Sequence, residues 1–76
     1  MKEILESMIL NLVDNREQVS IEEKVEEENI IYKVTVAQED MGRVIGKQGR
    51  VAKAIRTLMK SLGAKEKKKI TIEFVG

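Results

Sequence analysis

Two glycines separated by two polar residues, Gly46-Lys47-Gln48-Gly49, form the segment of this chain best suited to bind a ligand. Either glycine can adopt a positive φ at little cost, and neither carries a side chain that would hold an incoming backbone away. A helix is expected to begin after Gly49, so its unpaired N–H groups and the positive end of its dipole lie at the same place. Lys47 adds a cation there. These features predict a site for an anionic group such as a phosphate.

The residues around this predicted helix start have the wrong charge for helix stability. Lys47, Arg50 and Lys53 are all cationic, and each exposed cation at a helix N-terminus costs roughly 0.3 to 1 kcal/mol. Local rules tend to be broken where function requires it, so the turn is interpreted as one that an anion completes. Further along the same helix, Arg56 and Lys60 continue a basic stripe with the spacing i, i+3, i+6 and i+10 from Arg50.

Charge is distributed unevenly along the chain, although the net charge is only +1. Residues 1–41 contain 4 basic and 11 acidic residues, whereas residues 42–76 contain 10 basic and 2 acidic residues. This division predicts a domain with one basic and one acidic face, which would attract a polyanion to a defined surface. The alternative is that a chain with 36% charged residues segregates its charges to some degree by chance.

Composition argues against an enzyme. The chain has no cysteine and no histidine, which excludes disulfides, Cys/His zinc sites, thiol nucleophiles and imidazole bases. The segment from Gly42 to Gln48 fails the Walker A pattern, because three residues separate its glycines and no Ser or Thr follows Lys47. We therefore expect no catalytic residue, no metal site and no cofactor.

The length of the chain limits how many domains it can contain. Its 76 residues predict a single domain, 1–76, without a linker, repeat or low-complexity segment. No apolar run approaches the roughly 18 to 20 residues that span a bilayer, and the first residues do not resemble a secretory signal. A cytoplasmic protein with no membrane association is expected.

The first half of the chain predicts a helix and a hairpin. An apolar stripe with helical spacing runs from Ile4 to Val13 and predicts an amphipathic helix that ends near Asn15. Val19, Ile21 and Val25 suggest a strand, and alternate apolar residues from Ile30 to Val36 predict a second strand. The polar segment 26–29 between them predicts a hairpin turn.

The second half predicts two helices and a final strand. Asp40 is expected to cap a short helix over residues 41–45. A long helix follows the glycine loop, with Gly63 placed to end it, and residues 70–74 alternate as a strand. The predicted buried face of the long helix consists of Val51, Ala54, Ile55, Leu58, Met59 and Leu62. The order α-β-β-α-α-β predicts an α+β fold in which three helices cover one face of a mixed three-stranded sheet.

The segment 41–56, with Val44-Ile45-Gly46-Lys47-Gln48-Gly49-Arg50 at its centre, closely resembles the KH-domain motif. The predicted element order is that of the type II KH fold. Over its whole length the chain is most similar to the KhpA family of bacterial stand-alone small KH proteins. Gln38 is a small departure, since similar proteins often have proline there, and it bears only on how the first short helix begins.

The resemblance implies binding of single-stranded RNA, whose backbone is clamped at the Gly-x-x-Gly loop while the bases lie over a groove between the adjoining helices and the sheet. It also implies a broad-specificity RNA chaperone or post-transcriptional regulator, acting as a homodimer or with a KhpB (Jag)-type partner. The RNA-binding residues predicted on this basis are Arg43, Val44, Ile45, Gly46, Lys47, Gln48, Gly49, Arg50, Lys53 and Arg56.

Several assignments stay open at this stage. Val44, Ile45 and Val51 are candidates for the groove floor, but each could equally be a core residue. The lysines of the run 65–69 could contact a phosphate backbone or simply be solvated. With Tyr32 and Phe74 as its only aromatics, the chain cannot form an aromatic stacking platform. The alternative function is a protein-protein interaction module whose main role is dimerisation or scaffolding of a partner.

Overall fold

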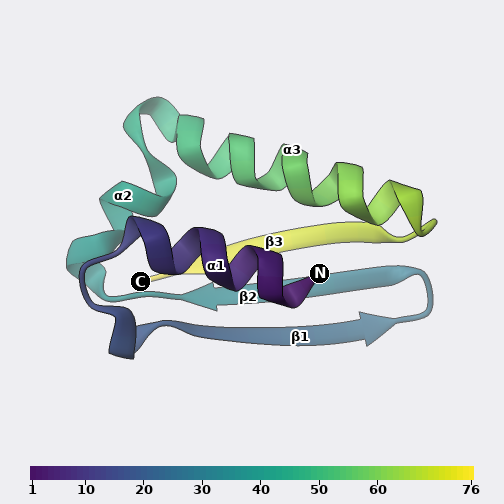
Figure 1. Cartoon of the computed structure of the whole chain (residues 1–76), viewed down its shortest axis with the longest axis horizontal. Coiled ribbons are helices and arrows are strands. Elements are labelled where there is room, and N and C mark those ends of the chain that lie inside the picture. The colour runs from purple at the N-terminus through teal and green to yellow at the C-terminus, as the bar shows by residue number, and fades with distance from the viewer.

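The structure, a computed structural model, describes all residues 1–76 and confirms the predicted order of helices and strands (Figure 1). None of the helices is both long and apolar enough to cross a membrane. In chain order the elements are α1 (Lys2–Leu12), η1 (Arg16–Gln18), β1 (Ser20–Glu26), β2 (Asn29–Thr35), η2 (Gln38–Asp40), α2 (Met41–Ile45), η3 (Lys47–Gly49), α3 (Arg50–Lys65) and β3 (Lys69–Val75).

The sheet is mixed, as predicted, with the strand order β1-β2-β3. β1 and β2 form an antiparallel hairpin in which Ile21 lies opposite Val34. β2 and β3 are parallel, with Tyr32 opposite Ile72, because the chain crosses over through α2 and α3 between them. Figure 1 shows the three α-helices on one face of this sheet. β3 pairs with β2 alone, so its other edge is free.

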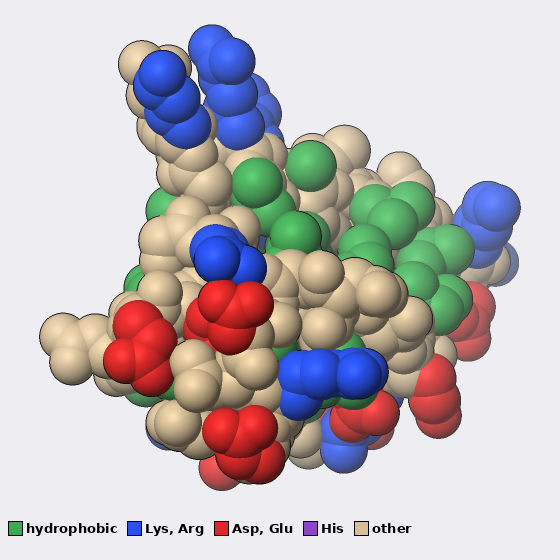
Figure 2. Space-filling view, turned by 60° about the vertical axis from the view of Figure 1, so that its left-hand side comes forward, with side chains coloured by type: hydrophobic (Ala, Val, Ile, Leu, Met, Phe, Trp, Pro, Cys, Tyr) green, Lys and Arg blue, Asp and Glu red, His purple; other side chains and the backbone are tan.

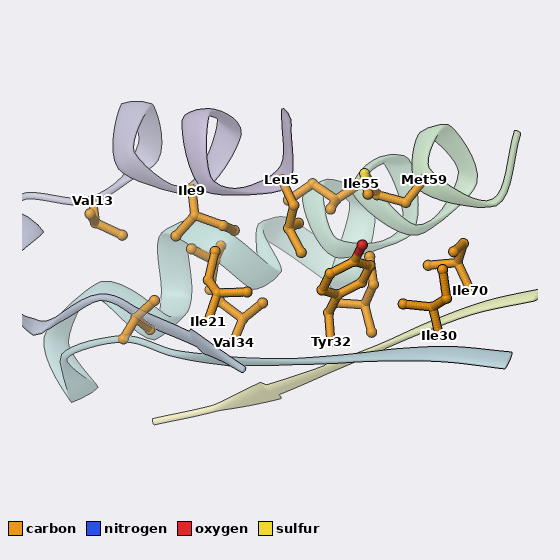
Figure 3. Packing of buried hydrophobic residues seen from close by; sticks show 13 residues of the cluster. Leu5, Ile9, Val13, Ile21, Ile30, Tyr32, Val34, Ile55, Met59 and Ile70 are labelled. Atoms are coloured by element: carbon orange, nitrogen blue, oxygen red, sulfur yellow. The ribbon is translucent and has the colours of Figure 1, made fainter. Parts of the chain in front are cut away.

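The hydrophobic core lies between the sheet and the helices (Figure 3). The predicted alternation in β2 is confirmed, because Ile30, Tyr32, Val34 and the following Val36 are all buried. Tyr32 is completely inaccessible and its hydroxyl donates a hydrogen bond to Glu23 Oε2 at 2.7 Å. Burial, followed by this hydrogen bond, raises the pKa of the Tyr32 phenol. Tyr32 is therefore a core residue and its side chain cannot contact a ligand.

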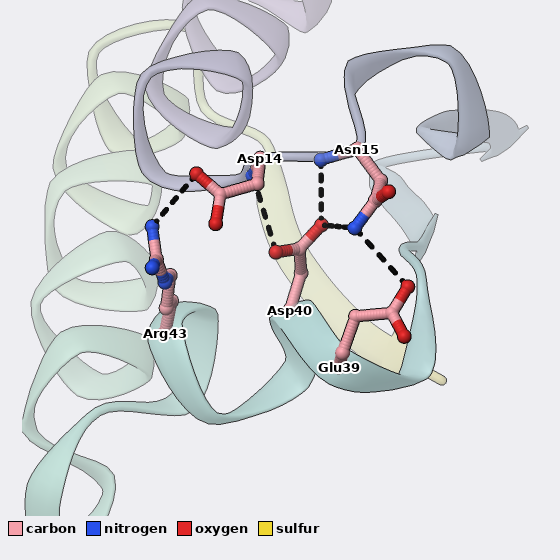
Figure 4. A network of polar contacts seen from close by, with 5 residues as sticks. All are labelled: Asp14, Asn15, Glu39, Asp40 and Arg43. Carbon is pink, nitrogen blue, oxygen red and sulfur yellow. Dashed lines mark hydrogen bonds and ion pairs between the residues drawn. The ribbon is translucent and has the colours of Figure 1, made fainter.

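α1 ends earlier than predicted, at Leu12 rather than near Asn15. Val13 is buried and adopts an extended conformation, with φ −100° and ψ 156°, which stops the helix. The next two backbone N–H groups are used elsewhere, since those of Asp14 and Asn15 donate to the carboxylate of Asp40 at 3.1 and 2.9 Å (Figure 4). These N–H groups do not continue the helix, because Asp40, 25 positions beyond Asn15, accepts their hydrogen bonds.

Asp40 does not have the role that the sequence suggested. It stands at the N-cap position of α2, but its side chain makes no capping hydrogen bond to that helix. The carboxylate is buried and joins α2 to the end of α1, where it also accepts from Asn15 Nδ2 at 3.0 Å. The N–H of Asn15, together with the N–H of Asp14 and the Asn15 amide, lowers the pKa of Asp40. An acceptor that tied two distant segments together could not be distinguished from a cap in the sequence.

Gly63 was also predicted wrongly, because α3 continues past it to Lys65. A Cβ at Gly63 would meet the Ile70 side chain and would lie 2.9 Å from the carbonyl oxygen of Lys68, so glycine is needed here for close packing. Lys67 takes the positive φ of 58° that ends the helix. The N–H of Lys68 then donates to Gly63 O at 2.8 Å and that of Lys67 to Ala64 O at 3.1 Å, which is a Schellman motif.

The acidic hairpin turn and the lysine-rich run lie side by side, at the end of the long axis opposite the Gly46–Gly49 loop (Figure 1). The N–H of Lys69 donates to Glu28 O at 2.8 Å, and Lys68 Nζ donates to Glu27 O at 3.3 Å. Acidic and basic residues from the two halves of the sequence therefore meet at this end. The predicted separation into one basic and one acidic face does not hold at this end.

Candidate nucleic-acid interface

The Gly46–Gly49 loop is a tight turn held by backbone hydrogen bonds. Gly46 (φ 77°), Gln48 (φ 58°) and Gly49 (φ 74°) all have positive φ. The N–H of Gly46 donates to Gly42 O at 2.8 Å, and the N–H of Gly49 donates to Gly46 O at 3.1 Å. Lys47 and Gln48 are exposed at the tip. The chain thus reverses direction between α2 and α3 with two polar side chains presented to solvent.

The two glycines of the loop are required for different reasons. A Cβ at Gly46 would lie 2.7 Å from Val51 Cβ and 2.8 Å from Val51 N, so this glycine lets the loop press against the first turn of α3. A Cβ at Gly49 would meet nothing within 4 Å, and only its positive φ favours glycine. Gly42, in α2, also has open space around it. Gly46 is therefore the position that fixes where α3 begins relative to the loop.

α3 carries two flanks of different chemistry. The basic flank consists of Lys53, Arg56 and Lys60, and the uncharged flank of Val51, Ala54 and Leu58. Both sets have the spacing i, i+3, i+7, and they are offset by two residues, which is a rotation of about 200° around the helix. The single stripe from Arg50 to Lys60 that the sequence suggested is therefore incomplete, and only Lys53, Arg56 and Lys60 share a side of α3.

The middle residue of the basic flank, Arg56, contacts β3. Arg56 Nε donates to Ile72 O at 3.3 Å, and the Arg56 Cζ atom lies 5.1 Å from the centroid of the half-buried Phe74 ring. Lys53 and Lys60 are exposed on either side of Arg56.

The cations at the loop have no carboxylate partners. The salt bridges of the molecule join the N-terminal amine to Glu3, Lys24 to Glu26 and Arg43 to Asp14. None of them includes Lys47, Arg50 or a member of the basic flank. Positive charge around the start of α3 is therefore left uncompensated by the protein, which is the arrangement that attracts an anion.

The uncharged flank faces α1 across an open groove of about 530 Å³. The two helices line it with Met8, Asn11, Leu12, Arg50, Val51, Ala54, Ile55 and Leu58. Figure 2 shows hydrophobic side chains exposed near Lys and Arg side chains that project from the loop end of the molecule. Leu58 is 44% exposed, and so is Ile4 on α1. Sequence reasoning missed this groove because it assigned Ala54 and Leu58 to the core and left Val51 open between the core and the floor of an RNA groove.

A pattern in the sequence could have indicated the groove. On α1, the residues at helical spacing from Ile4 are Ser7, Met8 and Asn11, all uncharged. On α3, Ala54, Leu58 and Ser61 continue in the same way. In a chain with 36% charged residues, two partly exposed helix faces without charge are typical of a protein-protein interface.

The structure brings most of the predicted RNA-binding residues to one end of the molecule. Lys47, Gln48 and the two loop glycines form the turn, and Arg50 lies where the loop meets the groove. Ile45 is half-buried at the end of α2.

Two of the predicted residues lie apart from this cluster. Val44 is completely buried in the core. Arg43 points toward the end of α1, where its Nη1 lies 3.0 Å from Asp14 Oδ1 (Figure 4).

The element order, the mixed sheet and the Gly-x-x-Gly turn between two helices define a KH domain of type II. A family model described as "KhpA/KhpB, KH domain" matches residues 2–74. The chain therefore belongs to the KhpA/KhpB KH-domain family, which confirms the resemblance noted in the sequence.

Curated relatives match over nearly the entire chain. A protein of Clostridium perfringens is 51% identical over 99% of this chain and all of its own length. One of Listeria monocytogenes is 49% identical over 99% of both chains, and one of Chlamydia trachomatis is 44% identical over 99% of this chain and 96% of its own. All three are named RNA-binding protein KhpA, a name that describes a bacterial binding protein and not an enzyme, as predicted. No solved structure matched the chain.

Proposed function

We propose that this chain, as a single KH domain over residues 1–76, binds single-stranded RNA. The phosphates dock at the Gly46–Gly49 loop, and the strand continues along the basic flank of α3 with its bases against α2, α3 and the free edge of β3. The observation that carries the proposal is the cluster of uncompensated cations around the start of α3, beside a turn with exposed backbone. The names of the relatives support the same ligand.

The basic flank is a better path for RNA than the groove on the other side of α3. A polyanion needs cations spaced along its backbone, and the basic flank supplies the exposed Lys53 and Lys60 about two turns apart, with the half-buried Arg56 between them. The groove has one cation, Arg50, at its loop end. The strand therefore enters at Lys47 and follows the basic flank toward Phe74.

Charge reversal at the loop tip tests the proposal. Lys47→Asp with Gln48→Asp places two negative charges where a phosphate docks and leaves the glycines and the core unchanged. We expect the affinity for a short unpaired RNA to fall at least about tenfold while the melting temperature stays within a few degrees. A matched control, Lys2→Asp with Gln18→Asp, makes the same residue changes away from the loop and should leave binding within about twofold. Unchanged binding by the loop variant at normal stability would refute the clamp.

Salt dependence tests the electrostatic part separately. Three to four neutralised phosphates predict a slope of log K against log salt of about −2 to −3 for a single strand, at roughly 0.7 per contact. Replacing Lys53 by alanine should make the slope shallower by about 0.7 and weaken all sequences alike, because phosphate contacts do not read bases. A slope near zero would favour a protein-interaction module over an RNA-binding domain.

The groove favours a second role, docking of another protein chain. Six of its eight lining residues are hydrophobic, and Arg50 is the only charged one. Leu58 in its wall and Ile4, one turn before Met8 on α1, are both exposed, so each copy offers a hollow and apolar side chains on its surface. Such a surface can pair with itself about a two-fold axis. We propose a homodimer, or a heteromer with a KhpB (Jag)-type partner, joined through this groove.

Dimerisation would compensate for weak binding by one domain. A footprint of about four nucleotides without an aromatic platform predicts roughly micromolar affinity, or about −8 kcal/mol. A second RNA-binding surface raises the effective concentration and lengthens the RNA that is bound. This arrangement suits a broad-specificity RNA chaperone or post-transcriptional regulator. Sedimentation at about tens of micromolar tests it, and a strict monomer that binds one short RNA with nanomolar affinity would contradict it.

A further inference from the structure

Arg56 differs from the other cations of α3 because β3 holds its guanidinium in place. Its Nε donates to Ile72 O at 3.3 Å, and its Cζ lies 5.1 Å from the centroid of Phe74. Contact with a carbonyl through Nε and with an aromatic ring beside Cζ restricts where the group can lie. Lys53 and Lys60 make no side-chain hydrogen bond or ion pair. Arg56 is therefore a rigid group between two flexible ones.

The outward half of this guanidinium is unused. Arginine carries N–H donors on Nε, Nη1 and Nη2, and only Nε has an acceptor in the protein. No carboxylate forms a salt bridge with Arg56. The side chain is half-buried, so it remains accessible along the free edge of β3. The protein has thus positioned two parallel donor groups without providing acceptors for them.

We propose that Arg56 reads a base, selecting one that offers two adjacent acceptors. Guanine presents O6 and N7, and cytosine presents O2 and N3, each matching a bidentate arginine. Adenine and uracil have no edge with two adjacent acceptors, because adenine places its N6 amine beside N1 and N7, and uracil places N3–H between O2 and O4. The single strand therefore has a preference for G or C over A or U at the position beside Phe74. This inference rests on the proposed RNA binding along the basic flank.

The surroundings favour a base over a phosphate as the ligand of Arg56. Lys53 and Lys60, about one turn before and after it, supply mobile ammonium groups that can follow phosphates. The Phe74 ring and the Ile72 carbonyl hold Arg56 against the sheet, where the bases of a strand lying over β3 would come. A guanidinium held against the sheet cannot move with a mobile phosphate, but it can pair with the edge of a base that is itself held in place. A bidentate pair discriminates between bases by about 1 to 3 kcal/mol, so at least about a fivefold preference is expected.

The test compares hexanucleotides that do not pair with themselves. We would measure binding of rC6, rA6, rU6 and a uridine hexamer with one central G by fluorescence anisotropy. Wild-type protein should bind rC6, and the G-containing hexamer, at least about fivefold more tightly than rU6 and rA6. Arg56→Lys keeps the charge but removes the paired guanidinium donors, so the preference should fall below about twofold, and rC6 binding should weaken more than rU6 binding. Lys60→Gln, the control, should weaken all four RNAs equally.

A second variant keeps the test decisive if Arg56→Lys unfolds. Phe74→Leu retains the arginine but removes the ring that orients it, so the preference should again shrink. Equal loss for all RNAs in Arg56→Lys would show that Arg56 contacts a phosphate, and a wild-type preference near one would also overturn the inference. Both results leave the proposed function standing if Lys47→Asp with Gln48→Asp still abolishes binding. Failure of the wild-type protein to bind any of the four would refute RNA binding itself.

Discussion

The two sides of α3 differ in chemistry, and we propose a different ligand for each. On one side Lys53, Arg56 and Lys60 have no carboxylate partners, and Arg56 contacts β3. On the other side Val51, Ala54 and Leu58 form one wall of a groove with α1. The sets interleave in the sequence, and an offset of two residues separates them by about 200°. The charges of α3 therefore indicate a binding surface only when each charged residue is assigned to one side of the helix.

The largest effect on stability should come from Gly46, which fixes where α3 and its two flanks begin. Gly46→Ala forces a Cβ against Val51 at a positive φ, which should cost about 2 to 4 kcal/mol of unfolding free energy. Gly42→Ala is the matched control, because its Cβ meets nothing within 4 Å and alanine is the better helix former by about 1 kcal/mol. Chemical denaturation measures both. Equal stability of the two variants would mean that the loop does not press on α3.

The next effect concerns the attachment of α1, the opposite wall of the groove. Asp40→Ala removes the acceptor of the Asp14 and Asn15 N–H groups and should lower the melting temperature by at least about 5 °C. We expect self-association to weaken more than RNA binding, because the basic flank does not depend on α1. RNA binding lost in parallel with association would show that the two sides are not independent.

Asp40 also predicts a pH dependence. Its pKa is lowered in the folded state, so the stability it contributes is complete above its ordinary value of 3.8 and is lost as the pH falls through the lowered value. The difference in melting temperature between wild type and Asp40→Ala should therefore narrow below about pH 4. A gap that stays constant from neutral to strongly acidic pH would contradict the cause we assign to the shift.

A pair of substitutions two residues apart tests the separation of the flanks directly. Leu58→Glu puts a charge into the groove and should weaken dimerisation at least about tenfold, with binding of a short RNA nearly unchanged. Lys60→Glu should do the opposite, weakening RNA roughly three- to tenfold at low salt and leaving the dimer intact. Sedimentation measures the dimerisation constant of each variant, and fluorescence anisotropy measures its affinity for RNA. Any pattern in which both variants lose the same property would remove the distinction between the flanks.

The smallest effect is expected at the far end of the molecule. Lys65→Gln with Lys69→Gln removes two cations from the run beside the acidic hairpin turn, opposite the loop. RNA affinity should change by less than about twofold, and the salt slope should stay the same. A shallower slope would show that RNA extends along the whole length of α3.

Local pattern was sufficient to predict most of the fold. The alternation in β2 and the long helix α3 follow from apolar spacing that only one secondary structure satisfies. The errors share a cause, which is that a distant residue decides the outcome. Asp40 ends α1 across 25 positions, and Ile70 explains Gly63.

The site was predicted less completely than the fold. Sequence spacing identified the Gly46–Gly49 loop and its cations, because a glycine pair beside basic residues is a local feature. The rotation of α3 against the sheet depends on which of its apolar residues the core takes, and it took Ala52 rather than Ala54. Val51 and Leu58 were therefore left for the groove. The contact between Arg56 and Phe74 depends on how α3 lies on β3, which no local pattern reveals.

The most direct test of the central claim maps where RNA lies. Isotope-labelled protein would be titrated with a short unpaired RNA while backbone amide shifts are followed by NMR. We predict the largest shifts at Gly46–Gly49, along the basic flank of α3 and beside Phe74, with little change at Met8 and Leu12. Shifts concentrated on the groove residues of α1 and on Leu58, with the loop unaffected, would contradict the account.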